Sequence, residues 1–168
     1  MIKLIPQQTL TDIINSLMAI DGAQGAAIVD ARTGICLAEI QSQTHTGVGL
    51  AATMSAGTLQ TMARLGRMMT ETGTLEDTVS TFGGHQHIAR PLPSEFSEGL
   101  FLFLMLERSL DSDVLAMARY QLMHLVFGLS LVSFDSRAVN TTNPQNLLMD
   151  GPFAEKHDCS AGSVAAIW

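Results

Sequence analysis

One uninterrupted apolar run, GLFLFLML at residues 99–106, constrains the fold of this chain more than any other segment. The run is well short of the roughly 18 residues that a membrane-spanning helix needs. A short continuous run of this kind is typical of a strand that is buried on both faces. We therefore expect it in the interior of a sheet that other elements cover.

Helical and strand patterns precede and follow this run in a regular order. Apolar residues recur every three or four positions between Thr9 and Ile20, which predicts a helix opened by a capping box of Thr9 and Asp12. A hairpin is expected next, with strands at 26–30 and 35–40 and a turn at Gly34. A long helix at about 48–69 follows, and then a meander of three strands at about 75–82, 85–93 and 99–106. The last helix is expected from a cap at Asp111 to about residue 132.

This order, α-β-β-α-β-β-β-α, predicts an α+β sandwich around one central five-stranded antiparallel sheet, a profilin-like architecture. We interpret residues 1–132 as one domain. Residues 133–168 mix Asn, Thr, Pro, Gly and Ser with scattered apolar residues. This composition predicts an irregular C-terminal extension, or a tail that docks on the domain or on a partner.

The composition narrows the classes of function. Hydrophobic residues make up 46% of the 168 residues and charged residues 15%, which is typical of a chain that buries a core. The net charge is -7, and the nine Lys and Arg residues are scattered, so we expect neither nucleic acid nor an anionic membrane as a partner. Cys36 and Cys159 form no CxxC pair, which favours two free thiols. We find no secretory signal in the sequence and expect a cytoplasmic protein.

Two segments carry a resemblance to a known family. The first, LMAIDGAQGAAIVDARTGICLA, has the end of a helix, a Gly, an apolar strand, an Asp and a turn Gly. The second, GGHQHIARPLPSEFSEGLFLFLMLER, has a polar strand, Arg-Pro-Leu, and an apolar strand that ends in an acid and a base. In the order and spacing of these pieces, over about residues 8–130, the chain resembles the Roadblock/LC7 family, which includes roadblock-type dynein light chains and bacterial GTPase regulators.

The resemblance implies a non-enzymatic homodimeric module that regulates or scaffolds a small Ras-like GTPase, or attaches to a signalling or motility assembly. It also implies that the long helix and the first meander strand pair with their copies in a second subunit. Small side chains early in this helix permit close approach, and an edge strand needs covering, so a twofold partner would bury both. The residues expected at this interface are Ala52, Ser55, Leu59, Met62, Leu75, Thr78 and Ser80.

A second surface is expected on the exposed side of the long helix. Gln60, Arg64, Arg67 and Met68 lie there, and the two arginines form a small basic spot in an acidic protein. We interpret this side as a candidate partner surface, and an ordinary solvated helix face is the alternative.

His85 and His87 are two residues apart on a predicted strand, so they share a face and one metal ion could reach both. A third ligand would have to be His45, His124, His157 or Cys159, and none of these is at motif spacing. We therefore favour two solvent-facing imidazoles on a strand and expect no metal site.

No motif of catalysis or cofactor binding emerges from the sequence. GVGLAA at residues 47–52 matches GxGxxA at a helix start, but a polar linker rather than a strand precedes it, so we expect no dinucleotide site. Cys36 alternates with strand residues and is interpreted as a packing residue. We expect no enzyme activity and no cofactor.

Two alternatives to the interaction module remain open. One is a small-molecule sensor of profilin-like or PAS-like architecture, with a pocket between the sheet and the helices. The other is a metal-dependent enzyme that uses His85 and His87.

Overall fold

The computed structural model of the protein describes residues 5–42, 47–69, 74–94, 99–108 and 112–141. Its elements follow one another in the order that the sequence predicts, and the α+β fold class is confirmed. The bounds of the elements are α1 (Gln7–Met18), β1 (Ala23–Asp30), β2 (Cys36–Gln41), α2 (Val48–Met69), β3 (Thr78–Phe82), β4 (His85–Pro91), β5 (Leu100–Glu107) and α3 (Ser112–Thr141).

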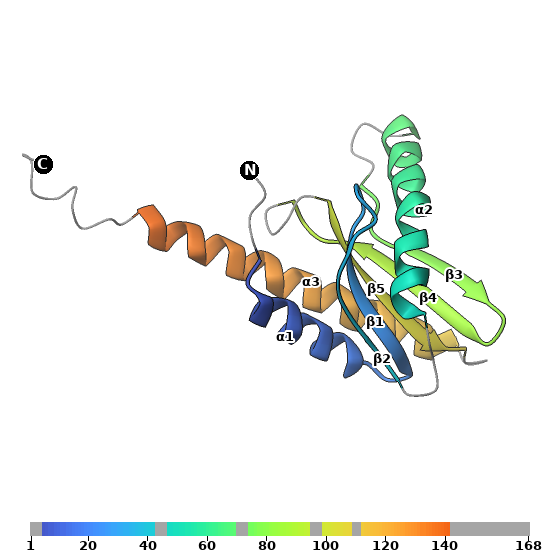
Figure 1. Ribbon diagram of the computed structural model, residues 1–168. Helices are drawn as coiled ribbons and strands as arrows, with labels where there is room; N and C mark the ends of the chain where they lie inside the picture. Colours follow the sequence, from blue (N-terminus) through green and yellow to red (C-terminus); the bar gives the residue numbers. More distant parts are fainter. Residues whose placement is uncertain (1–4, 43–46, 70–73, 95–98, 109–111, 142–168) are drawn as a thin grey trace, which may run out of the picture.

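The sheet is five-stranded and antiparallel, in the order β2-β1-β5-β4-β3. α2 crosses one face of the sheet, and α1 and α3 cover the other (Figure 1). β5 is the central strand, and its residues from Leu100 to Leu106 are all buried, as the apolar run predicts. β2 and β3 are the two edge strands.

Alternate side chains of β5 divide the core into two clusters. Leu102, Leu104 and Leu106 pack with residues of α1 and α3 on one face. Phe101 and Phe103 pack with residues of α2 on the other face. Since successive side chains of a strand point to opposite faces, the unbroken apolar run supplies both clusters at once.

The start of α1 differs from the sequence prediction. The N-cap is Pro6, no side chain caps the helix, and Thr9 lies within the first turn. The predicted capping box of Thr9 and Asp12 is therefore wrong. Proline at this place holds φ at -57°, close to the helical value, and it brings no additional N–H that would need a partner.

The predicted bounds of β3 and α3 also need correction. β3 begins at Thr78, so Leu75 precedes the strand instead of opening it. α3 continues to Thr141, so the interpretation of residues 133–141 as irregular is wrong. Asp111, the predicted cap, and residues 142–168 lie outside the described residues, and the division into a domain and an extension stays a prediction.

The helices of the described ranges do not have the character of membrane spans. None of them combines the length and the apolar composition that a membrane crossing requires.

Candidate interaction surface

α2 packs one narrow side onto its own sheet. A Cβ atom at Gly25 of β1 would overlap the side chain of Val48, so the first turn of α2 approaches β1 as closely as a glycine permits. The residues of α2 that are buried on this side are Val48, Gly49, Ala52, Ala56 and Leu59. The small residues of α2 therefore serve, in the first place, packing within the chain itself.

The adjacent side of α2 carries a mostly apolar and largely exposed stripe, which we call the α2 stripe. Its members follow one another at helical spacing along the whole length of α2, and 72% of Met54 and 74% of Met69 is exposed. The α2 stripe consists of Ala51, Met54, Ser55, Thr58, Met62, Leu65 and Met69. Since monomeric soluble proteins rarely expose a long contiguous apolar surface, this stripe is a candidate contact surface.

A groove of about 370 Å³ separates the first half of the α2 stripe from the edge strand β3. Its α2 wall is formed by Ala51, Met54, Ser55 and Thr58, and its β3 wall by Thr78, Ser80 and Phe82. His87, Ala89 and Phe103 form the floor. The groove joins the α2 stripe to the open edge of the sheet, so the two make one continuous surface.

The structure places the predicted interface residues in two groups. Ser55, Thr78 and Ser80 line the groove, and Met62 belongs to the α2 stripe. Ala52 and Leu59 are buried in the core cluster between α2 and the sheet of the same chain, so they are not accessible to a second copy. Leu75 is half-buried against the same core cluster. The interface as a whole stays a prediction.

His87 lies on the floor of the groove between two aromatic rings. Its ring centroid is 5.2 Å from that of Phe82 and 5.2 Å from that of Phe103. Burial lowers the pKa of His87 below its ordinary value of 6.5, and His85 on the same strand face lowers this pKa further. The neutral imidazole is therefore the form that the folded protein favours.

We expect the pKa of His87 to make folding sensitive to acid. Because the pKa is lower in the folded than in the unfolded state, the unfolded chain binds more protons as the pH falls below about 6.5. The contribution of neutral His87 to the free energy of unfolding is therefore complete above that pH. It is lost as the pH falls through the folded-state pKa. Urea unfolding at pH 7.5 and pH 5.5 should show a smaller pH dependence in His87→Gln than in the wild type. An equal pH dependence in both proteins would show that His87 does not cause it.

The described residues bring no third metal ligand to His85 and His87. Within the described ranges, no group of three or more His, Cys, Asp or Glu side chains is arranged to hold a metal ion. His124 lies on α3, on the opposite face of the sheet, where its ring contacts Tyr120. His45, His157 and Cys159 lie outside the described residues.

The candidate partner surface occupies a third side of α2. Arg64, Arg67 and Met68 are exposed, and Met68 is 84% exposed. The Gln60 amide donates a hydrogen bond to the backbone carbonyl of Ala31, which ties the middle of α2 to the turn after β1. The C-terminal half of α2 thus presents a basic side that faces away from the α2 stripe.

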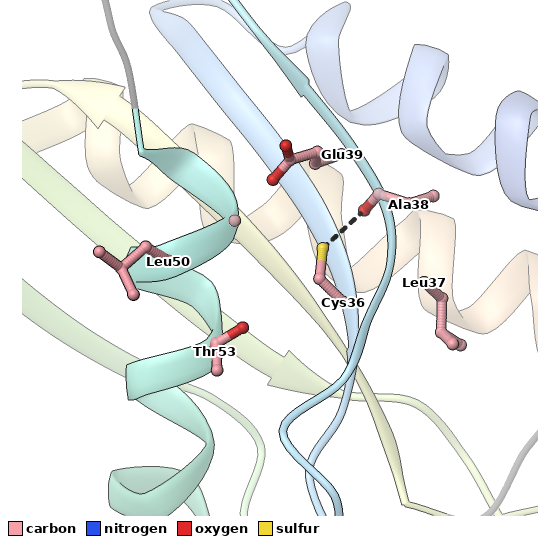
Figure 2. A pocket seen from close by; sticks show the side chains of 7 residues that line it. Cys36, Leu37, Ala38, Glu39, Leu50 and Thr53 are labelled. Carbon is pink, nitrogen blue, oxygen red and sulfur yellow. Dashed lines mark hydrogen bonds between the residues drawn. The ribbon is translucent and has the colours of Figure 1, made fainter.

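A second hollow, of about 350 Å³, lies between β2 and the start of α2 (Figure 2). Cys36 donates its S–H to the carbonyl of Ala38 at 3.4 Å. Burial, and then the negative charge of Glu39, raise the pKa of this thiol. A thiol with a raised pKa is a poor nucleophile, which agrees with the interpretation of Cys36 as a packing residue.

The GVGLAA segment opens α2, but its surroundings do not suit a phosphate. The strand before it, β2, is an edge strand antiparallel to β1, so no parallel β-α-β unit surrounds the helix. The carboxylate of Glu39 lies so close to Gly49 that a Cβ atom there would overlap it. A negative charge at this helix end disfavours an anionic ligand.

An ion-pair cluster that no sequence motif predicts surrounds Asp77. Its side chain is 5% exposed and accepts hydrogen bonds from Arg90 of β4 at 3.2 Å and from Arg119 of α3 at 2.9 Å. Asp77 immediately precedes β3, so the cluster fixes the start of the edge strand against β4 and α3. The only signal in the sequence was an acidic residue, Asp77, directly before a polar strand. This signal does not indicate which basic residues pair with it.

The layered fold, with a long helix on one face of an antiparallel sheet and two helices on the other, defines the class of this protein. It has a Roadblock/LC7-type fold. No family model matches the sequence, and no curated protein matches it. The fold is therefore recognised from the structure.

Three solved structures illustrate this similarity. MglB of Myxococcus xanthus superposes with a TM-score of 0.61 at 12% identity, over 79% of this chain and 99% of that one. The gliding protein MglB of Thermus thermophilus gives 0.61 at 14% identity, over 80% and 96%. A Roadblock/LC7 domain from Streptomyces avermitilis gives 0.55 at 14% identity, over 70% and 91%. At these identities the similarity concerns the fold.

Proposed function

We propose that the protein is a non-enzymatic homodimeric interaction module that binds, and regulates or scaffolds, a small Ras-like GTPase or a related signalling or motility assembly. The observation that carries this proposal is the continuity of the α2 stripe with the groove and the open edge of β3. An exposed, largely apolar helix face beside the open edge of a strand is typical of a contact surface, which supports a partner.

A second copy of the chain fits this surface. A twofold axis beside β3 would set the two edge strands against each other and the two α2 stripes side by side. Both exposed features would then be covered by one contact. The side chains that would meet there, Met54, Met62, Leu65 and Phe82, are apolar and exposed in the subunit.

The basic side of α2 supplies the proposed contact with the GTPase. Arg64 and Arg67 project from the exposed C-terminal half of α2 in a chain of net charge -7, so they would attract an acidic surface locally. The class of partner follows from the resemblance to the Roadblock/LC7 family. One protein of this fold is described as a gliding protein, which supports a motility assembly as the wider setting.

We expect charge reversal on this side to weaken the GTPase complex. Arg64→Glu combined with Arg67→Glu should raise the Kd for a Ras-like GTPase encoded near this protein by about tenfold or more, since each change replaces attraction by repulsion. Fluorescence titration with the GTPase loaded with GDP and with a GTP analogue measures the Kd, and nucleotide exchange and hydrolysis rates report regulation.

Arg108→Glu is the control for each single reversal on α2, because it makes the charge change of one Arg→Glu substitution at an exposed residue of another surface. It should leave the Kd close to that of the wild type. An unchanged Kd in the double α2 variant would exclude this side as the contact. No binding of any such GTPase by the wild type would contradict the proposed partner.

The groove also supports the alternative of a small-molecule sensor. Its volume of about 370 Å³ and its lining by Met54, Phe82, His87 and Phe103 suit a small apolar ligand. Native mass spectrometry of the purified protein and a thermal-shift screen test this alternative. A co-purified ligand lost in Phe82→Ala, a change at an exposed residue of the groove wall, would support it, and a protein that carries and binds none would count against it.

A further inference from the structure

α3 carries an apolar stripe on the side that points away from the sheet. One side of α3 is buried in the core at Ala118, Leu122 and Val126. On the opposite side, exposed residues follow at intervals of three, four and three positions, and 55% of Tyr120 and 62% of Phe127 is exposed. We call this the α3 stripe, and it consists of Met117, Tyr120, His124 and Phe127.

A helix that is apolar on both sides is typical of a position buried all round. Among the described residues, however, only the core side of α3 is covered, and α1 and α3 lie together on one face of the sheet (Figure 1). The alternating spacing of three and four residues is that of the a and d positions along which two helices pack. The spacing therefore points to another helix as the occupant.

The α3 stripe is complementary to itself in the antiparallel direction. When two copies of α3 are related by a twofold axis level with Leu122, Met117 of one copy lies opposite Phe127 of the other. Tyr120 lies opposite His124 in the same arrangement, because both pairs are centred on residue 122. A thioether against an aromatic ring and a phenol hydroxyl against an imidazole nitrogen are favourable contacts.

Two small residues border the α3 stripe and are also centred on residue 122. They are Ala116 and Gly128, both exposed, and a Cβ atom at Gly128 would meet no other atom within 4 Å. Small residues beside a helix seam permit the two backbones to approach closely. Open space beside Gly128 in the subunit agrees with a neighbour that comes from outside it.

The area available is near the lower limit for a specific contact. Aromatic side chains bury roughly 150–250 Å² each, so the exposed parts of the α3 stripe and of Met123 offer roughly 500 Å² per copy. Two copies would bury roughly 1,000 Å², which is about the minimum for a specific interface.

We propose that the α3 stripe is a second self-association surface, at which the α3 helices of two copies pack antiparallel about a twofold axis level with Leu122. This surface lies on the opposite face of the sheet from the α2 stripe, so one subunit can use both. The proposed assembly is therefore larger than a dimer, with α2–β3 contacts and α3 contacts alternating between copies.

Disulfide cross-linking of the full chain tests the arrangement. In a background with Cys36→Ser and Cys159→Ser, Met117→Cys combined with Phe127→Cys should form a covalent dimer under mild oxidation. The two positions are ten residues apart on one helix, about 15 Å, and a disulfide needs Cα atoms within about 7 Å. A bond between them within one copy is therefore excluded, and the dimer band on a non-reducing gel reports pairing.

The two single variants are the matched controls. In the antiparallel arrangement each cysteine is about 15 Å from the equivalent cysteine of the second chain. Neither single variant should therefore cross-link. The absence of a covalent dimer in the double variant would overturn the proposal. It is the result expected if residues 142–168 of the same chain, or another protein, cover the α3 stripe instead of a second copy. Cross-linking of the single variants would indicate parallel pairing and would overturn it as well.

Light scattering separates this inference from the proposed function. Tyr120→Glu changes an exposed residue of the α3 stripe and should reduce the assembly to a dimer, and Met54→Glu in the α2 stripe should do the same. The two together should give the chain mass of 18.0 kDa. If Tyr120→Glu leaves the mass unchanged while Met54→Glu gives a monomer, the α3 contact is refuted and the α2–β3 dimer stands. The reverse result refutes the dimer and keeps the α3 contact.

Discussion

Replacement of Asp77 by alanine is expected to lower the free energy of unfolding by about 3–5 kcal/mol. Asp77 is nearly buried, and the side chain of Arg90, which contacts it at 3.2 Å, is 13% exposed. Removal of the carboxylate leaves the Arg90 guanidinium largely shielded from water and without its counter-ion. The free-energy cost of this unpaired charge exceeds what the ion pair itself contributes. Urea unfolding followed by circular dichroism at neutral pH measures the change.

Arg119→Gln provides the matched control for Asp77→Ala. Arg119 donates two hydrogen bonds to Asp77, but its side chain is 47% exposed, so its loss should cost no more than about 1 kcal/mol. Asp77 then keeps Arg90 as its partner. Equal losses in the two variants would contradict this explanation, because they would mean that Arg90 does not depend on the carboxylate.

The position of Asp77 gives this cluster a functional consequence. It lies directly before β3, the strand that we propose to meet a second copy. A chain that loses the cluster should therefore lose order at the start of β3 before it unfolds as a whole. We expect Asp77→Ala to weaken the α2–β3 dimer as well as the fold.

Met54→Glu is expected to raise the Kd of the α2–β3 dimer by about 100-fold or more. A carboxylate placed without a counter-ion in an apolar contact costs about 3 kcal/mol or more, and every 1.4 kcal/mol changes the Kd about tenfold. Met54 is exposed in the subunit, so the thermal stability of the monomer should change little. Sedimentation velocity over a dilution series, in a Tyr120→Glu background, measures this contact alone.

Arg64→Glu is the control for Met54→Glu, because it introduces a carboxylate on the same helix but on the side proposed to face the GTPase. It should leave the dimer Kd unchanged while it weakens GTPase binding. If the two substitutions on α2 affect the dimer Kd equally, the α2 stripe is not the contact.

The architecture could be predicted from local patterns alone. The apolar run of β5 required cover on both faces, and the alternation of helical and strand segments fixed the order of elements. These features depend on the residues of each segment and not on distant ones. The end of α3 was missed because residues 133–141 contain Ser, Asp and Asn, whose low helical preference the helix nevertheless accommodates.

The site was predicted in part, for a reason that concerns α2. This helix has small and apolar residues on two adjacent sides, so its sequence does not say which side packs on the sheet. Ala52 and Leu59 were assigned to the interface and lie in the core, whereas Met54 and Thr58 were not assigned and line the groove. Only the position of the sheet distinguishes the two sides.

The Asp77 cluster and the surroundings of His87 could not be predicted. Arg90 and Arg119 are 13 and 42 residues from Asp77 in the sequence, and the register that brings them together arises from the whole sheet. His87 was placed on one face with His85 from strand alternation, but Phe82 and Phe103 reach its ring from two neighbouring strands.

Hydrogen exchange of β3 tests the central claim, a homodimer through the α2 stripe and the edge of β3, most directly. About every second amide of an edge strand points away from its neighbouring strand and exchanges freely unless a partner covers it. In the wild type, peptides that contain Thr78–Phe82 should exchange more slowly at high than at low protein concentration, and Met54→Glu should abolish the difference. Exchange rates in β3 that stay the same at all concentrations would contradict the claim.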